Sequence, residues 1–231
     1  MLDRILYQNN GCLVVNKLCG ETVQGTLEGA ESLIKKIKNE SSIKAEIVQA
    51  VHRLDVPVTG CVLIALTKDS LSFLGNAFAA KGTIIKKTYW AVIEKPKSAL
   101  PESGELIHYI ETNSKTNKSF AYNEDAAGRK KASMSYRITG EGDNYLFLEV
   151  QLHSGRHHQI RAQLKAAGLH IKGDVKYGAK RSEKTGGIRL HARSLSFPNP
   201  LNKNEIIAIT ADPPIMDNLW LSFNTKYYVK N

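Results

Sequence analysis

Cysteine is scarce in this chain, and its few residues follow no metal-binding or disulfide spacing. Cys12, Cys19 and Cys61 are odd in number and form no CxxC pair. Two of them lie within apolar runs, so we expect buried, reduced thiols and exclude a disulfide framework. No apolar run approaches the roughly 18–20 residues that span a bilayer, and the first residues lack a signal-peptide core. The sequence therefore predicts a cytoplasmic protein with no membrane partner.

Acidic residues are outnumbered by basic ones, and the imbalance is local. The chain has 22 Asp and Glu against 32 Lys and Arg, a net charge of +10. The segment from Arg129 to Arg193 holds 14 basic and 5 acidic residues, so it carries nine of these charges. A basic run is usually a solvated surface, but here basic clusters recur through one segment. No helix there joins a basic face to a broad aromatic or aliphatic one, so a nucleic acid is a better partner than a membrane surface.

The chain lacks internal repeats and regular alternation of strands with helices. Its 231 residues and 42% hydrophobic content suit one globular domain. We expect strands at residues 11–16, 61–67, 86–94, 104–111, 118–123, 132–139, 145–152, 188–197 and 205–210. We expect helices at residues 28–40, 69–81, 157–167 and 213–221. This order predicts an α+β fold, with a mixed, mostly antiparallel central sheet flanked by helices. We expect a single catalytic domain over residues 1–231, acting as a monomer.

Specific residues define the predicted ends and faces of two helices. Asp69 is the expected N-cap of the helix at 69–81, and Gly82 is its expected stop. In the helix at 157–167, Ile160, Leu164 and Ala167 are spaced to form one buried stripe.

The sequence VHRLD at residues 51–55 is the first candidate for chemistry. It places Asp55 beside a cation, in a turn that leads into a predicted buried strand. A carboxylate can act as a general acid, general base or nucleophile, depending on the groups around it. An aspartate that only caps the turn is the alternative interpretation.

A second dense stretch, HSGRHHQIR at residues 153–161, lies at a predicted strand-to-helix junction. Backbone N–H groups at such a junction favour anions, including an RNA phosphate. Arg161 is the best cationic partner for Asp55, although a helix-surface arginine is the alternative. The histidines do not predict zinc, because no HExxH pattern or cysteine pair accompanies them. We expect no metal.

Three shorter motifs complete the set. In the KKTYW strand, alternation puts Lys87 and Tyr89 on one face, and Tyr89 could stack on a base. A glycine-bounded loop, GDVKYG, covers residues 173–178, where Asp174 and Tyr177 could order a loop or simply belong to a glycine turn. His191 lies inside a predicted strand and, like His52, also suits a structural histidine.

Together and in this order, these motifs resemble the RluA-type family of RNA pseudouridine synthases. The resemblance runs from the first predicted strand to about Pro200. It implies that Asp55 is the catalytic carboxylate, that Arg161 is its ion-pair partner and that Tyr89 stacks on the flipped uracil. No cofactor is implied. The residues that the same motifs assign to substrate binding are His52, Arg53, Thr59, Lys87, Arg156, His158, Gln159 and Ile160, among which Arg53 would hold the flipped nucleotide and Ile160 would wall the base pocket.

The chain departs from the family pattern at two places. After HRLD and two variable residues the family usually has Thr-Ser-Gly, where this chain has Val58-Thr59-Gly60, so a hydroxyl gives way to a methyl group at Val58. Many relatives also carry an amino-terminal S4 RNA-binding domain, whereas here the catalytic strands begin within the first 15 residues. We therefore expect a stand-alone catalytic domain.

Two other function classes are compatible with the motifs. A catalytically silent RNA-binding relative would keep the basic segment and lose the chemistry. A hydrolase or nuclease could use Asp55 with a histidine, but clustered acidic metal ligands are lacking. The sequence does not name the target, since a basic surface reads backbone and shape in ribosomal and transfer RNA alike.

Overall fold

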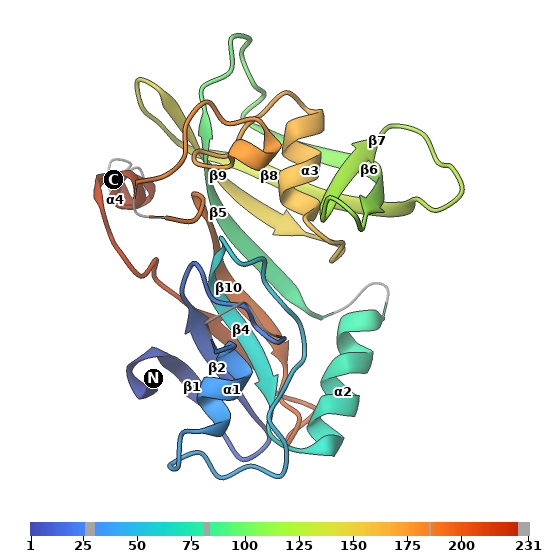
Figure 1. Ribbon diagram of the computed structural model, residues 1–231, viewed down its shortest axis with the longest axis vertical. Coiled ribbons are helices and arrows are strands. Elements are labelled where there is room, and N and C mark those ends of the chain that lie inside the picture. Colours follow the sequence, from blue (N-terminus) through green and yellow to red (C-terminus); the bar gives the residue numbers. More distant parts are fainter. Residues whose placement is uncertain (26–30, 81–83, 185, 226–231) are drawn as a thin grey trace. The chain divides into compact units, whose positions relative to one another are not determined.

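The chain forms two compact units. The computed structural model describes residues 1–25, 31–80, 84–184 and 186–225, with side chains described up to residue 223. Unit 1 comprises Met1–Lys87 and His191–Ile215, and unit 2 comprises Thr88–Leu190 and Met216–Asn231. Each unit contains its own group of neighbouring strands (Figure 1). That the two units act as one catalytic domain stays a prediction.

Unit 1 is built on a mixed sheet in the order β1-β2-β4-β10, with β3 paired to β4 and β11 paired to β10. The β4 and β10 strands are parallel, and the other pairs are antiparallel. Its elements are η1 (Leu2–Arg4), β1 (Ile5–Gln8), β2 (Cys12–Lys17), α1 (Leu33–Lys38), β3 (Gln49–Ala50), β4 (Thr59–Ala65), α2 (Lys68–Ala79), β10 (Leu190–Pro198) and β11 (Ile206–Thr210).

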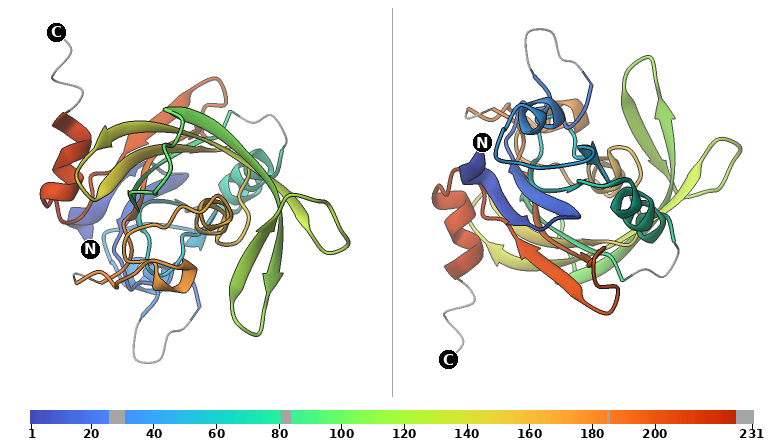
Figure 2. Two further views of the ribbon diagram at one scale, coloured as in Figure 1. Left: turned by 90° about the horizontal axis from the view of Figure 1, so that it is seen from above. Right: turned by 90° about the horizontal axis from the view of Figure 1, so that it is seen from below.

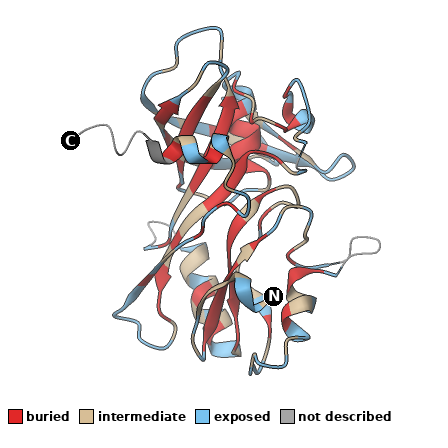
Figure 3. Cartoon of the chain, turned by 90° about the vertical axis from the view of Figure 1, so that its left-hand side faces the viewer, coloured by how far each residue is buried: buried red, intermediate tan, exposed pale blue. Residues whose placement is uncertain are grey.

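One face of this sheet packs against α2. Cys12, Cys61 and Leu63 point to the same side as Leu74 of the helix, because alternate strand residues share a face. The two cysteines are buried free thiols, as expected, and burial raises the pKa of each to about 12. Figure 3 shows the buried residues of the molecule gathered along its strands.

Both helices of unit 1 differ from the prediction at their ends. Thr67, not Asp69, caps α2, because its extended backbone lets its hydroxyl accept the amide of Ser70 at 3.1 Å. Ser32 caps α1 in the same way, so this helix is shorter than the predicted 28–40. Residues 28–30, Lys81 and the predicted stop Gly82 lie outside the described residues.

Unit 2 is built on an antiparallel sheet in the order β5-β9-β8-β6-β7. Its strands curve, and α3 lies on the concave side beside β6 and β7 (Figure 2). The elements of this unit are β5 (Lys86–Glu94, beginning in unit 1), β6 (Ser103–Asn113), β7 (Lys118–Tyr122), β8 (Lys130–Glu141), β9 (Tyr145–Leu152), α3 (Gln159–Ala166), η2 (Val175–Tyr177) and α4 (Asn218–Thr225).

The two α-helices of unit 2 start later than predicted. His158 has a left-handed backbone with φ of 51°, so α3 begins at Gln159, and Ala167 is exposed rather than part of the buried stripe. The last helix begins at Asn218 instead of residue 213, because the Asp217 carboxylate accepts the amide of Trp220 at 3.3 Å.

The strands of the two units confirm the α+β prediction, since their pairs are mostly antiparallel and they are accompanied by few helices. The strands at 86–94 and 145–152 have the predicted bounds. The predicted strand at 61–67 is the buried β4, although it starts two residues earlier. In the described part of the chain, no helix has the length and apolar character needed to cross a bilayer.

Candidate active site

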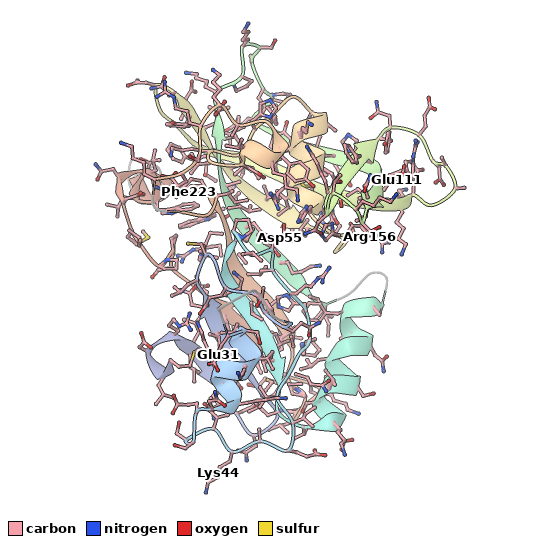
Figure 4. All side chains as sticks on the ribbon, in the orientation of Figure 1. Glu31, Lys44, Asp55, Glu111, Arg156 and Phe223 are labelled. Atoms are coloured by element: carbon pink, nitrogen blue, oxygen red, sulfur yellow. The ribbon has the colours of Figure 1, made fainter. Side chains whose placement is uncertain are left out.

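Asp55 lies in a turn of unit 1 that leads into β4 (Figure 4). The amide of Val58 donates to the Asp55 carbonyl at 3.0 Å, which closes the turn around Val56 and Pro57. Asp55 is half-buried. The turn thus fixes the backbone of Asp55, and the residue is neither fully exposed nor fully buried.

A buried lysine supports this turn. Lys17 ends β2 and has no exposed surface, and its Nζ donates to the carbonyls of Leu18 at 2.7 Å, Val56 at 3.1 Å and Val58 at 2.8 Å. Burial lowers the pKa of Lys17 to about 8, against the opposing effects of nearby acidic groups that include Asp55. Sequence reasoning missed Lys17. Its signal was a lysine that ends a strand whose first four residues are apolar, a position where a charge needs partners.

The residues after the turn are fixed by β10. Gly60 has φ of +115°, and a Cβ atom there would lie 2.3 Å from the carbonyl oxygen of Ala192, so only glycine fits this close parallel approach. Thr59 Oγ1 lies 2.7 Å from His191 Nδ1, and His191 Nε2 lies 2.9 Å from the Ala211 carbonyl. A carbonyl only accepts, so Nε2–H donates to it and the Thr59 hydroxyl donates to Nδ1.

The Thr59–His191 hydrogen bond lies where this chain departs from the family pattern, at Val58 and Thr59. Val58 is buried, at 2% exposure, and its carbonyl accepts a hydrogen bond from Lys17 Nζ. The hydroxyl of Thr59, one position later, is bonded to His191. The turn of this chain is therefore supported by Lys17 and the Thr59–His191 pair.

His52 has the contacts of a structural histidine. Its Nε2 accepts the amide of Leu63 at 3.1 Å, and its ring stacks on Phe78 with 5.1 Å between centroids. Burial, followed by the charge of Lys87, lowers the pKa of His52 to about 3. These contacts agree with the structural alternative for His52 and His191. Substrate binding by His52 and Thr59 stays a prediction.

Replacing His191 should make the free energy of unfolding less dependent on pH between 6.5 and 4. Burial lowers the pKa of His191 from 6.5 to about 4, so below pH 6.5 the unfolded chain binds a proton that the folded chain refuses. Wild-type stability should therefore fall as the pH drops from 6.5 to 4, by roughly 3 kcal/mol from this residue. The variant His191→Gln lacks this titration. The difference in unfolding free energy between wild type and His191→Gln should therefore be smaller at pH 4 than at pH 7 by that amount, as measured by urea unfolding at the two pH values. The exposed His153, changed to Gln, is the control; equal pH dependence in wild type and His191→Gln would contradict the prediction.

Two further predicted substrate contacts lie in unit 1. Arg53 is exposed, two residues before Asp55. Lys87 is half-buried with its Nζ 6.0 Å from the Phe78 ring centroid, and burial lowers its pKa. Their roles toward a nucleotide stay predictions.

In unit 2, Arg161 forms a buried bidentate ion pair with Asp174. Arg161 Nε donates to Oδ2 at 2.7 Å, and Nη2 donates to Oδ1 at 2.8 Å. The two side chains are 4% and 1% exposed. Arg161 is thus no helix-surface residue, and its guanidinium plane is fixed by two charge-assisted bonds. The loop at 173–178 is therefore more than a glycine turn.

Tyr177 connects this pair to the start of α3. Its buried ring lies 4.6 Å from the Arg161 guanidinium carbon. Its hydroxyl accepts the amide of Ser119 at 2.8 Å and lies 2.8 Å from His158 Nδ1. His157 stacks on His158 and bonds to the Ser119 hydroxyl at 2.8 Å. The two histidines are thus bonded to protein partners.

The remaining predicted residues of unit 2 have mixed exposure. Gln159 Oε1 accepts from the Ser154 hydroxyl at 2.8 Å and from the Arg156 amide at 3.0 Å, so it holds the turn before α3. The Arg156 side chain is exposed, with Nε 3.2 Å from the Lys131 carbonyl. Ile160 is 4% exposed.

Tyr89 lies on β5 opposite Val150 of β9 and is 8% exposed. Asp55 belongs to unit 1, whereas Tyr89 and Arg161 belong to unit 2. The pairing of Asp55 with Arg161 therefore stays a prediction. Among the described residues, no three His, Cys, Asp or Glu side chains gather into a metal-binding group.

Comparison with known proteins gives the family. The model of the RNA pseudouridylate synthase family matches residues 11–166. The chain is 34% identical, over 180 residues, to ribosomal large subunit pseudouridine synthase C of Rickettsia conorii, covering 77% of this chain but only 57% of that protein. It is 28% identical to tRNA pseudouridine synthase C of Haemophilus ducreyi, over 94% and 92% of the two chains. The structure of human RNA pseudouridylate synthase domain containing 4 shares the fold, with a TM-score of 0.74, 22% identity and coverage of 97% and 93%. This chain belongs to the RNA pseudouridylate synthase family.

Proposed function

We propose that this protein isomerises uridines of ribosomal or transfer RNA to pseudouridine, with Asp55 as the catalytic carboxylate. The family match over residues 11–166 carries the proposal, because it includes Asp55, Tyr89 and Arg161. The substrate class follows from relatives named for ribosomal and for transfer RNA. The net charge of +9 on the segment from Arg129 to Arg193 fits such a polyanion.

The reaction is balanced without a cofactor. The N1–C1′ bond breaks, the uracil turns, and a C5–C1′ bond forms. The proton on C5 leaves, and N1 ends with a proton, so nothing is oxidised or reduced. Asp55 can serve by attacking the sugar or the uracil, or by removing a sugar proton.

In this proposal Arg161, Tyr89 and Arg53 position the catalytic carboxylate and the target nucleotide. Arg161 pairs with Asp55 and favours its ionised form, and its own orientation is supported by Asp174. Extruding the uridine from its stack costs a few kcal/mol, which Tyr89 offsets by stacking on the uracil. Arg53 holds the flipped nucleotide.

The loss of the C5 proton gives a direct test. Uridine-labelled RNA carrying tritium at C5 should release tritium to water when it is incubated with the purified protein. Mapping pseudouridine in total RNA from cells with and without the protein should reveal the sites that it modifies. RNA binding without tritium release and without a lost site would instead identify a catalytically silent relative.

A further inference from the structure

Three lysines of unit 2 lie on elements that contact one another, since α3 packs against both β7 and η2. Lys118 begins β7, Lys165 lies in the last turn of α3, and Lys176 belongs to η2 (Figure 1). Lys176 Nζ donates to the carbonyls of Thr116 at 3.1 Å and Asn117 at 2.7 Å, the two residues directly before Lys118. Loop 173–178 is thereby fastened to the β6–β7 turn.

Lys118 is the centre of this cluster. Its Nζ lies 5.2 Å from the ring centroid of the buried Tyr177, which also contacts Arg161 on α3. Partial burial, followed by the charges of Lys165 and Lys176, lowers the pKa of Lys118. Like charges on elements that contact one another repel.

The carboxylate of Asp174 opposes this repulsion. Both of its oxygens, however, are already bonded to Arg161. Among the ion pairs of the described residues, none includes Lys118, Lys165 or Lys176. The cluster therefore has an excess of positive charge that an anion would relieve.

An exposed aromatic ring beside the cluster favours a nucleic acid over an acidic protein. Phe120 follows Lys118 on the same face of β7, since strand residues two apart share a face. It is 39% exposed, and its ring centroid lies 5.8 Å from Lys118 Nζ. A cation for the phosphate next to a ring for the base is the combination that binds single-stranded RNA.

We propose that Lys118, Lys165 and Lys176 bind a backbone phosphate of the RNA substrate, with Phe120 stacking on an adjacent base. This inference rests on the proposed function and adds to it a substrate contact outside the motifs that surround Asp55. The contact reads backbone and shape, not sequence.

The test compares salt dependence of RNA binding between charge-matched variants. The main variant is K118Q/K165Q, which keeps the bonds of Lys176 to the β6–β7 turn. The control is K44Q/K97Q, which removes two exposed lysines elsewhere. The probe is an unmodified hairpin transcript with uridines in its loop, and affinity is measured by fluorescence anisotropy over a salt series.

We expect K118Q/K165Q to bind the hairpin roughly tenfold more weakly at low salt, with the slope of log affinity against log salt reduced by about 0.7–0.9 for each lost phosphate contact. K118R/K165R should restore both values. F120A should weaken binding and leave the salt slope unchanged. Equal losses in K44Q/K97Q, or equal competition by polyglutamate and by RNA, would overturn the inference.

Tritium release, measured on the same proteins, separates this inference from the proposed function. If wild type releases tritium and K118Q/K165Q keeps the wild-type salt slope, the phosphate site is wrong and the isomerase stands. If the slope changes as expected but wild type releases no tritium, the RNA site stands and the isomerase is wrong.

Discussion

Asp55→Asn should reduce pseudouridine formation by at least about 10⁴-fold, because asparagine can neither attack as a carboxylate nor accept the proton. Affinity for RNA should change little, since the basic segment from Arg129 to Arg193 remains intact. The measurement is single-turnover tritium release, with RNA affinity determined in parallel on the same protein.

The hydrogen bonds of the turn around Asp55 should survive this substitution. The Val58–Asp55 bond and the bonds from Lys17 involve backbone carbonyls, so the substitution leaves them in place. A loss of rate then reports the carboxylate and not a collapsed turn. Asp69→Asn, at an exposed position in the first turn of α2, is the matched control and should keep the wild-type rate. A variant that formed pseudouridine at wild-type rate without the Asp55 carboxylate would remove this residue from the mechanism.

Strand positions were predictable because the relevant signals are local. An apolar run such as residues 61–66 has only one stable place, the interior of a sheet. Helix ends were less predictable. Asp69 and Thr67 both have side chains that can cap, and the choice depends on which residue is held in an extended backbone by the strand before it.

Contacts between distant motifs could not be predicted from spacing. The sequence predicted Arg161 as a partner for a carboxylate, but nothing in its spacing selects Asp174, thirteen residues later. That pair depends on η2 returning the loop to α3, a consequence of three-dimensional packing. Lys17 was missed for the same reason, since its three carbonyl acceptors come from residues 18, 56 and 58.

Asp174→Asn should lower the free energy of unfolding by about 3–5 kcal/mol, because it removes the charged partner from a buried, bidentate ion pair with Arg161. The pair is almost completely shielded from solvent, so screening by water offers little relief. This is a large fraction of the roughly 5–15 kcal/mol that stabilise a typical protein. Urea unfolding followed by circular dichroism measures it. Asp143→Asn, at an exposed position in the β8–β9 turn, is the control and should change stability little.

A double variant separates the structural part of Asp174 from its positioning of Arg161. In R161L/D174L both buried charges are gone, so much of the lost stability should return, as buried ion pairs are often replaced by apolar residues at little net cost. Pseudouridine formation should not return, because Asp55 would lack its proposed cationic partner. Tritium release in the double variant at a wild-type rate would show that Arg161 serves only the fold of unit 2. Recovered stability with no turnover would instead place Asp174 as the residue that holds Arg161 for the chemistry.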